Sequence, residues 1–468
     1  MLLFTQLSAD DYLFRAAMLE HLPAAVFLFV FGACVGSFLN VVVYRLPRNM
    51  RLLIPPSRCT SCDHRLRFFR ENLPILGWIA SRGRCRYCGE RISIEYPVIE
   101  ATVACMFLLV YALAYWIPTG TPFFGEVFGQ WWHANGLARS LPMYIALMGL
   151  LCGLLAMTLI DARTFTIPIQ IPIVVTFIAL VCSVWQSLID TAHTTAQTWP
   201  MPGVDWTWAG AAIGGWIGVL LSTLLLRAGI FKPSFADYED FVDEGEVLGE
   251  YPHARREVLR ECVFLLPAVI GFAAGWMLGY EGGAPPLAMQ AIGGSLLGYL
   301  VGGGLVWAIR ILGTFAFGRE AMGLGDVHLL GCVGAVLGWW DPILIFFIAP
   351  FSGLLWAAVS AALASALHRP RREIPYGPHL AVAAAAVIFL HPWVMDGWRI
   401  LLPGTSLPGD GLVESQDSGE IERRDDWTSG AMFDSMRVVI VAARSGRAGH
   451  EVPPDHDPWS SETEKGHA

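Results

Sequence analysis

Long apolar stretches dominate the hydrophobic pattern of this 468-residue chain. Ten stretches come close to the about 20 residues that an α-helix needs to cross a bilayer. They cover residues 23–43, 97–117, 141–160, 168–189, 206–226, 262–280, 289–312, 326–341, 343–367 and 379–395. Only Asp341 and Pro342 interrupt the eighth and ninth, as either a tight turn or a kink. The pattern predicts an all-α polytopic membrane protein with about 8–10 transmembrane helices.

Composition supports this fold class, because 54% of the residues are hydrophobic and only 15% are charged. Residues 44–97 carry 11 arginines against four acidic residues, which places this loop in the cytoplasm by the positive-inside rule. Alternating from there, both termini lie outside. No basic region precedes the first apolar stretch, so we interpret it as a retained helix rather than a cleaved signal peptide.

These features divide the chain into five parts. Residues 1–22 form an N-terminal segment, 23–43 the first transmembrane helix, 44–97 the cytoplasmic loop, 97–400 a helical membrane domain and 404–468 a tail. The tail is rich in Asp, Glu, Ser, Gly and Pro, a composition typical of disorder.

Four of the ten cysteines lie in the cytoplasmic loop as two CxxC pairs separated by 22 residues: Cys59, Cys62, Cys85 and Cys88. This spacing is typical of a tetrahedral zinc site. Four thiolates leave no open coordination position, so the ion is expected to be structural. A redox pair or free thiols are the alternatives. For the six single cysteines in apolar stretches, a role as small buried hydrophobic residues is favoured.

Two aspartates adjoin apolar stretches and are candidates for chemistry. Asp161 follows one such stretch, and Asp326 sits in the sequence Gly323-Leu-Gly325-Asp326, where another begins. Each alone is equally well explained as a helix cap. Together, two neighbouring carboxylates would share a proton and could act as general acid and base. Gly323 and Gly325 are expected to let the backbone approach a peptide and adopt conformations barred to other residues, and His328 receives no catalytic part.

Other acidic residues are interpreted more simply. Glu320, Asp341 and Glu373 are expected to be solvated or to cap helices. Residues 228–261 carry nine acidic and four basic side chains. This segment either attracts basic peptides or is solvated filler.

The chain resembles the type IV prepilin peptidases, inner-membrane enzymes of the GxGD aspartyl protease group. Five stretches match in order: 36–47; the cysteine pairs bracketing 71–78; 95–100; 161–168; and 320–330. A sixth, Pro375-Tyr-Gly-Pro378, resembles the turn before the family's last helix. Compared with the family, residues from 206 to about 285 look like an inserted helix pair around an acidic loop, and the tail is a further addition.

This resemblance implies a function. Members cleave the basic leader from type IV prepilins or type II secretion pseudopilins after a glycine, at the cytoplasmic face of the bacterial inner membrane. Asp161 and Asp326 match their catalytic pair. Members with the cysteine loop commonly also methylate the new N-terminus with S-adenosylmethionine, so the loop is expected to be associated with methyltransferase activity.

Partners and alternatives follow from the same features. The expected partners are prepilin or pseudopilin substrates and the lipid bilayer, and no nucleic acid. One alternative is a catalytically inactive, zinc-organised membrane scaffold. The other is a proton-coupled transporter, since carboxylates within a membrane can relay protons.

Overall fold

The structure, a computed structural model, describes residues 9–52, 54, 56–59, 61–67, 71–189, 203–235, 253–279, 284–367 and 375–401. These residues are helical or irregular, with two isolated β-bridges in the cysteine loop. The predicted disordered tail, 404–468, lies outside the described residues, and so do Glu373 and the middle of the acidic segment, 236–252. The predicted all-α fold class is confirmed.

Each predicted apolar stretch overlaps a helix, but the helices that contain stretches 23–43 and 141–160 begin earlier, at Ala9 and Gln130. In chain order they are α1 (Ala9–Arg45), η1 (Leu46–Arg48), α2 (Leu76–Ala80), α3 (Glu95–Tyr111), η2 (Ala112–Trp116), α4 (Gln130–Thr164), α5 (Gln170–Ile189), α6 (Trp206–Arg227), α7 (Ala254–Met277), α8 (Leu287–Phe317), α9 (Leu324–Leu337), α10 (Asp341–Leu367) and α11 (Tyr376–Leu401). Within the described ranges, nine helices are long and apolar enough to cross a membrane.

The tenth apolar stretch forms a shorter helix. α9 has 14 residues and therefore spans about 21 Å, less than the ~30 Å of a bilayer's hydrocarbon core. It ends at Gly338, whose φ of 101° suits glycine alone, and α10 begins at Asp341. The interruption at Asp341 and Pro342 is therefore a tight turn between two helices rather than a kink in one.

α9 lies at the centre of the helix packing. Its side chains at Leu329, Leu330 and Val333 are fully buried, and it contacts α4, α5, α8, α10 and α11. α8 approaches it most closely: a Cβ placed on Gly298 would lie 2.0 Å from the carbonyl oxygen of Gly334. Membrane helices commonly pack through such small residues. A helix that is apolar all round can be buried in this way on every side.

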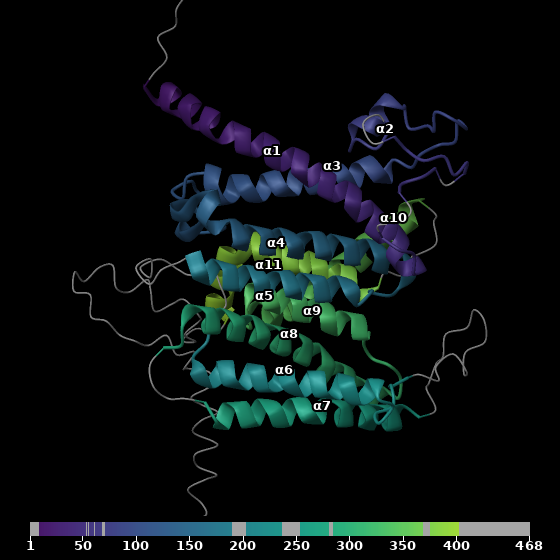
Figure 1. Cartoon of the computed structure of the whole chain (residues 1–468), viewed down its shortest axis with the longest axis vertical. Coiled ribbons are helices and arrows are strands. Elements are labelled where there is room, and N and C mark those ends of the chain that lie inside the picture. The colour runs from purple at the N-terminus through teal and green to yellow at the C-terminus, as the bar shows by residue number, and fades with distance from the viewer. Residues whose placement is uncertain are drawn as a thin grey trace, which may run out of the picture. The chain divides into compact units, whose positions relative to one another are not determined.

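The remaining helices pack against one another in pairs. α1 packs on α3, α4 on α5 and α11, and α6 on both α7 and α8; Figure 1 draws α6 and α7 as neighbouring teal helices. α7 and α10 expose apolar side chains, among them Leu266, Val269, Phe351 and Leu354. An apolar outer surface of this kind matches lipid tails, as expected for a polytopic membrane protein.

Candidate functional site

Asp161 lies in the last turn of α4 and is only 4% exposed. The helix stops three residues later because Phe165 adopts the left-handed conformation, with φ 55°, and its N–H donates to the carbonyl of Asp161 at 2.9 Å. The negative end of the helix dipole disfavours a carboxylate at this place. Helix capping therefore does not explain Asp161.

Asp326 is the third residue of α9 and is 8% exposed. Gly323 is the N-cap, and it lies beside the Asp326 carboxylate: a Cβ placed on Gly323 would lie 3.5 Å from Oδ2. A carboxylate that reaches back to the N-cap N–H is the reciprocal half of a capping box, and the helix N-terminus also favours negative charge. The capping interpretation thus accounts for part of the environment of Asp326, but not for its approach to Asp161.

Three helix ends meet at the two aspartates. Gly377, at the start of α11, lies against the carboxylate of Asp161: a Cβ placed on it would lie 2.5 Å from Oδ2. Asp161 and Tyr376 both lie close enough to Asp326 to interact with it electrostatically. The end of α4 and the beginnings of α9 and α11 therefore bring the two aspartates together, although they are distant in the sequence.

The side chain of Ile167 packs between Gly325 of α9 and Gly377 of α11. A Cβ on Gly325 would lie 2.7 Å from Cβ of Ile167, and one on Gly377 would lie 3.1 Å from its Cδ1. Both glycines are needed because backbone and side chain approach closely there. The expectation that Gly323 and Gly325 adopt conformations barred to other residues is wrong: Gly323 has φ −69° and ψ 144°, an ordinary extended conformation, and Gly325 is helical with no positive φ.

Sequence reasoning missed Ile167, Tyr376 and Gly377 as members of this site. From the sequence, the motif Pro375-Tyr-Gly-Pro378 resembles a turn before the last helix, and nothing in its composition indicates that it adjoins Asp161. His328, given no catalytic part, hydrogen bonds through Nδ1 to the hydroxyl of Tyr299 on α8 at 2.6 Å.

The four cysteines of the loop form one cluster. Each CxxC pair is a small turn closed by a β-bridge, Arg58 with Arg65 and Arg84 with Arg91. The same backbone hydrogen bond occurs in both turns. The N–H of Cys59 donates to the backbone carbonyl of His64 at 3.0 Å, and the N–H of Cys85 donates to the backbone carbonyl of Glu90 at 2.8 Å. Two copies of one turn therefore present their thiols to each other.

The thiols have the spacing of a tetrahedral metal site. All four Sγ atoms lie within 4.8 Å of one another, with 3.8 Å between Cys59 and Cys88 and 3.9 Å between Cys62 and Cys85. Sulfurs bound to one zinc ion at ~2.3 Å would stand about 3.8 Å apart. The residue types and the spacing of the cluster therefore fit a zinc ion.

Family models of known proteins match two parts of the chain, one of which contains the cysteine loop and the other Asp326. A family model described as bacterial peptidase A24 N-terminal domain matches residues 30–114, and one described as type IV leader peptidase family matches residues 256–358. The second match begins within α7, part of the predicted inserted pair, and does not include Asp161. The insertion therefore stays a prediction.

Several curated relatives carry the name prepilin leader peptidase/N-methyltransferase. The protein of Stutzerimonas stutzeri is 25% identical over 406 residues, covering 81% of this chain and 90% of that protein. The protein of Dickeya chrysanthemi is 28% identical over 399 residues, covering 79% and 93%. The protein of Myxococcus xanthus (strain DK1622) is 52% identical over 83 residues, which are 18% of this chain and 24% of that protein. No solved structure matches the chain.

The apolar helices and the four-cysteine loop define a polytopic membrane protein with a candidate metal centre. The chain matches the type IV leader peptidase family in two parts, as its sequence motifs predicted, and is similar over most of its length to bacterial prepilin leader peptidases.

Proposed function

We propose that the chain is an aspartyl endopeptidase that cleaves the leader from type IV prepilins or type II secretion pseudopilins after a glycine. Asp161 and Asp326 are the proposed catalytic pair. The observation that carries this proposal is the meeting of both buried carboxylates at the junction of α4, α9 and α11. Similarity to the family supplies the class of substrate, because the relatives are named for prepilin leaders.

The chemistry needs only these two carboxylates and a water molecule. Two adjacent carboxyl groups share one proton, because ionising both would place like charges side by side. The ionised group takes a proton from water, whose oxygen attacks the scissile carbonyl carbon, while the protonated group donates to the carbonyl oxygen. Collapse of this intermediate passes a proton to the leaving nitrogen, and the peptide bond breaks.

The active site is proposed to face the cytoplasm. Arg163, two residues after Asp161, pairs with Glu95 at the start of α3 at 2.9 Å, so the cysteine loop and the aspartates lie at the same end of the helices. The arginine excess of that loop favours the cytoplasmic side. A substrate helix in the bilayer would then present the junction with its leader to the aspartates.

We further propose that the loop supports N-methylation of the new N-terminus. A structural zinc ion held by the four thiols would keep the loop folded. Beside them lies a cavity of about 360 Å³ lined by Pro56, Ser57, Arg65, Leu66, Arg67 and Asn72. Its volume suits a small organic ligand, and its arginines suit the carboxylate of S-adenosylmethionine. That molecule, when bound, would supply the methyl group.

One assay tests the peptidase. The purified full-length protein is incubated with a peptide that carries a basic leader, a glycine and an apolar helix, and the products are read by mass spectrometry. Asp161→Asn and Asp326→Asn are each expected to abolish cleavage. Asp341→Asn, which changes a carboxylate in the first turn of α10, is the matched control and should cleave normally. Normal cleavage by either of the first two variants would falsify the catalytic pair.

The same assay separates the other classes of function. An inactive scaffold would leave the peptide intact with the unmodified protein. A proton-coupled transporter would also leave it intact, and in liposomes would change the internal pH when its solute is supplied.

A further inference from the structure

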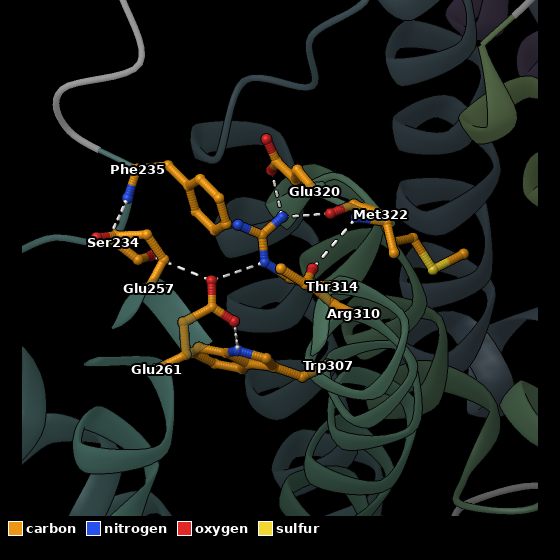
Figure 2. Close-up of polar contacts among 10 residues, drawn as sticks. Ser234, Phe235, Glu257, Glu261, Trp307, Arg310, Thr314, Glu320 and Met322 are labelled. Atoms are coloured by element: carbon orange, nitrogen blue, oxygen red, sulfur yellow. Dashed lines mark hydrogen bonds and ion pairs between the residues drawn. The ribbon is translucent and has the colours of Figure 1, made fainter. Parts of the chain in front are cut away.

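Arg310, near the end of α8, is a buried cation that joins three segments of the chain. Its side chain is 4% exposed, and its Nε donates to Oε1 of Glu261 on α7 at 2.9 Å. Its Nη1 donates to the carboxylate of Glu320 and to the carbonyl oxygen of Met322. Figure 2 shows the guanidinium between these partners and beside the ring of Phe235. The distance from Cζ of Arg310 to the centroid of that ring is 5.2 Å. Glu320, expected to be solvated or to cap a helix, is 36% exposed and also pairs with Arg310.

The contact with Met322 reaches the candidate active site. Met322 directly precedes Gly323, the N-cap of α9, whose carbonyl oxygen accepts the N–H of Asp326 at 3.2 Å. The segment from Gly318 to Gly323 is also held by Thr314, whose hydroxyl accepts the N–H of Ala321 at 3.2 Å. Arg310 therefore restrains the backbone that leads into the N-terminus of α9 and Asp326.

Glu261 determines where the guanidinium of Arg310 lies. It is 4% exposed, and besides Arg310 its two oxygens accept from Ser234 at 3.1 Å and from Nε1 of Trp307 at 3.0 Å. A carboxylate with this many donors has one orientation. A planar guanidinium paired with such a carboxylate through Nε is itself held in one plane. Without Glu261, the carboxylate that remains to Arg310 is that of Glu320, whose side chain is 36% exposed.

Glu261 is therefore not available to attract a basic leader, as the acidic segment 228–261 was considered to do. Glu257 is fully buried as well, paired with Arg260 at 2.6 Å and bonded to the N–H of Phe235 at 2.8 Å. Both acidic residues serve the packing of α7 against its neighbours. Their solvated interpretation is wrong.

We propose that Glu261 of α7 is a positioning residue for the peptidase: through Arg310 it holds the segment 318–323, and thereby Asp326, in the geometry needed for cleavage. This inference rests on the proposed function of Asp326. It gives α7 a part in catalysis in addition to its contribution to the membrane-spanning surface.

Kinetics distinguish positioning from simple stabilisation. Glu261→Gln removes the charge and keeps the size, and is expected to lower kcat at least ~10-fold with little change in KM, since a misplacement of about 1 Å can cost ~100-fold. Arg310→Gln should do the same, and the double variant should be no worse than either single one, because the residues act as a unit. Glu261→Asp should recover part of the activity.

Ser222→Ala is the matched control. It removes a buried hydrogen bond between α6 and α7, from the Ser222 hydroxyl to the carbonyl of Phe264 at 2.6 Å, without touching Arg310. Its kcat should equal that of the unmodified protein. Equal kcat for Glu261→Gln, or a loss in Ser222→Ala as large as in Glu261→Gln, would overturn the proposal. If Glu261→Gln does not fold, Trp307→Phe, which removes one donor to Glu261, takes its place with the same expected direction.

Hydrogen exchange of the backbone amides gives a readout that does not depend on activity. In Glu261→Gln, amides of residues 318–326 should exchange faster, while those of α4 stay unchanged. Unchanged exchange at 318–326 would also overturn the positioning role. If both aspartate variants cleaved normally, the proposed catalytic pair would fail, whereas full activity of Glu261→Gln beside inactive aspartate variants would sink only this inference.

Discussion

Gly377 lies against the carboxylate of Asp161, so closely that a Cβ at Gly377 would lie 2.5 Å from Oδ2 of that carboxylate. α11 can approach α4 this closely only because residue 377 has no side chain. The start of the last helix is thus part of the environment of an aspartate far earlier in the chain, and this relationship leads to a first prediction.

Gly377→Ala is expected to lower cleavage at least ~10-fold, because the added methyl group must displace the Asp161 carboxylate or Ile167. The measurement is kcat/KM with the leader peptide. Gly397→Ala is the control in the same helix, since a Cβ there meets nothing within 4 Å. Equal activity of the two variants would show that the tight contact at Gly377 does not matter for the reaction.

Removing zinc is expected to unfold the cysteine loop and leave the membrane helices folded, because the thiol cluster is confined to that loop. The loop carries many arginines, so trypsin should cut it rapidly after chelation or in Cys59→Ser. Elemental analysis should find one zinc ion per chain, and less in Cys59→Ser. Cys105→Ser, which changes a cysteine of α3 outside the cluster, should keep its zinc. Full zinc content in Cys59→Ser would contradict the assignment.

Glu100 is expected to dock the cysteine loop on the membrane helices. It is 8% exposed, and its Oε2 accepts the N–H of Ile75, which precedes α2, at 2.6 Å. Glu100→Ala leaves that N–H without its acceptor and should cost about 1–3 kcal/mol. Faster hydrogen exchange at residues 75–80 would reveal the loss.

Glu95→Gln is the control for Glu100→Ala on the same helix. Glu95 pairs with Arg163, but both side chains are about half exposed, and such surface pairs contribute ~1 kcal/mol or less. Its effect on exchange at residues 75–80 should therefore be small. An equal effect of the two variants would argue against a specific docking role for Glu100.

Methylation and cleavage should be separable. Asn72→Ala changes the lining of the loop cavity, whereas the aspartates lie on other elements. This variant is expected to release the leader normally and to lose methylation of the new N-terminus, read by mass spectrometry with S-adenosylmethionine present. Arg91→Ala, a loop arginine outside that lining, is the control and should retain both activities. Loss of cleavage in Asn72→Ala would show that the loop takes part in the peptidase step.

The sequence alone determined most of the helices and the membrane class, because an apolar stretch long enough to cross a bilayer can bury its backbone only as a helix. It also identified the two aspartates and the four cysteines, since a carboxylate beside an apolar stretch and a paired CxxC are local signals. The exception was α9, whose predicted range included the turn at Gly338.

Tertiary structure decided which residues surround those signals. Ile167, Gly377 and the pair of Glu261 with Arg310 became visible only when helices distant in the sequence were packed together. In the sequence, a glycine at a close contact between helices cannot be distinguished from any other glycine. A buried, paired glutamate in an acidic segment likewise cannot be distinguished from a solvated one. The partners of both residues are distant in the sequence, because such contacts depend on how whole helices pack and not on local composition.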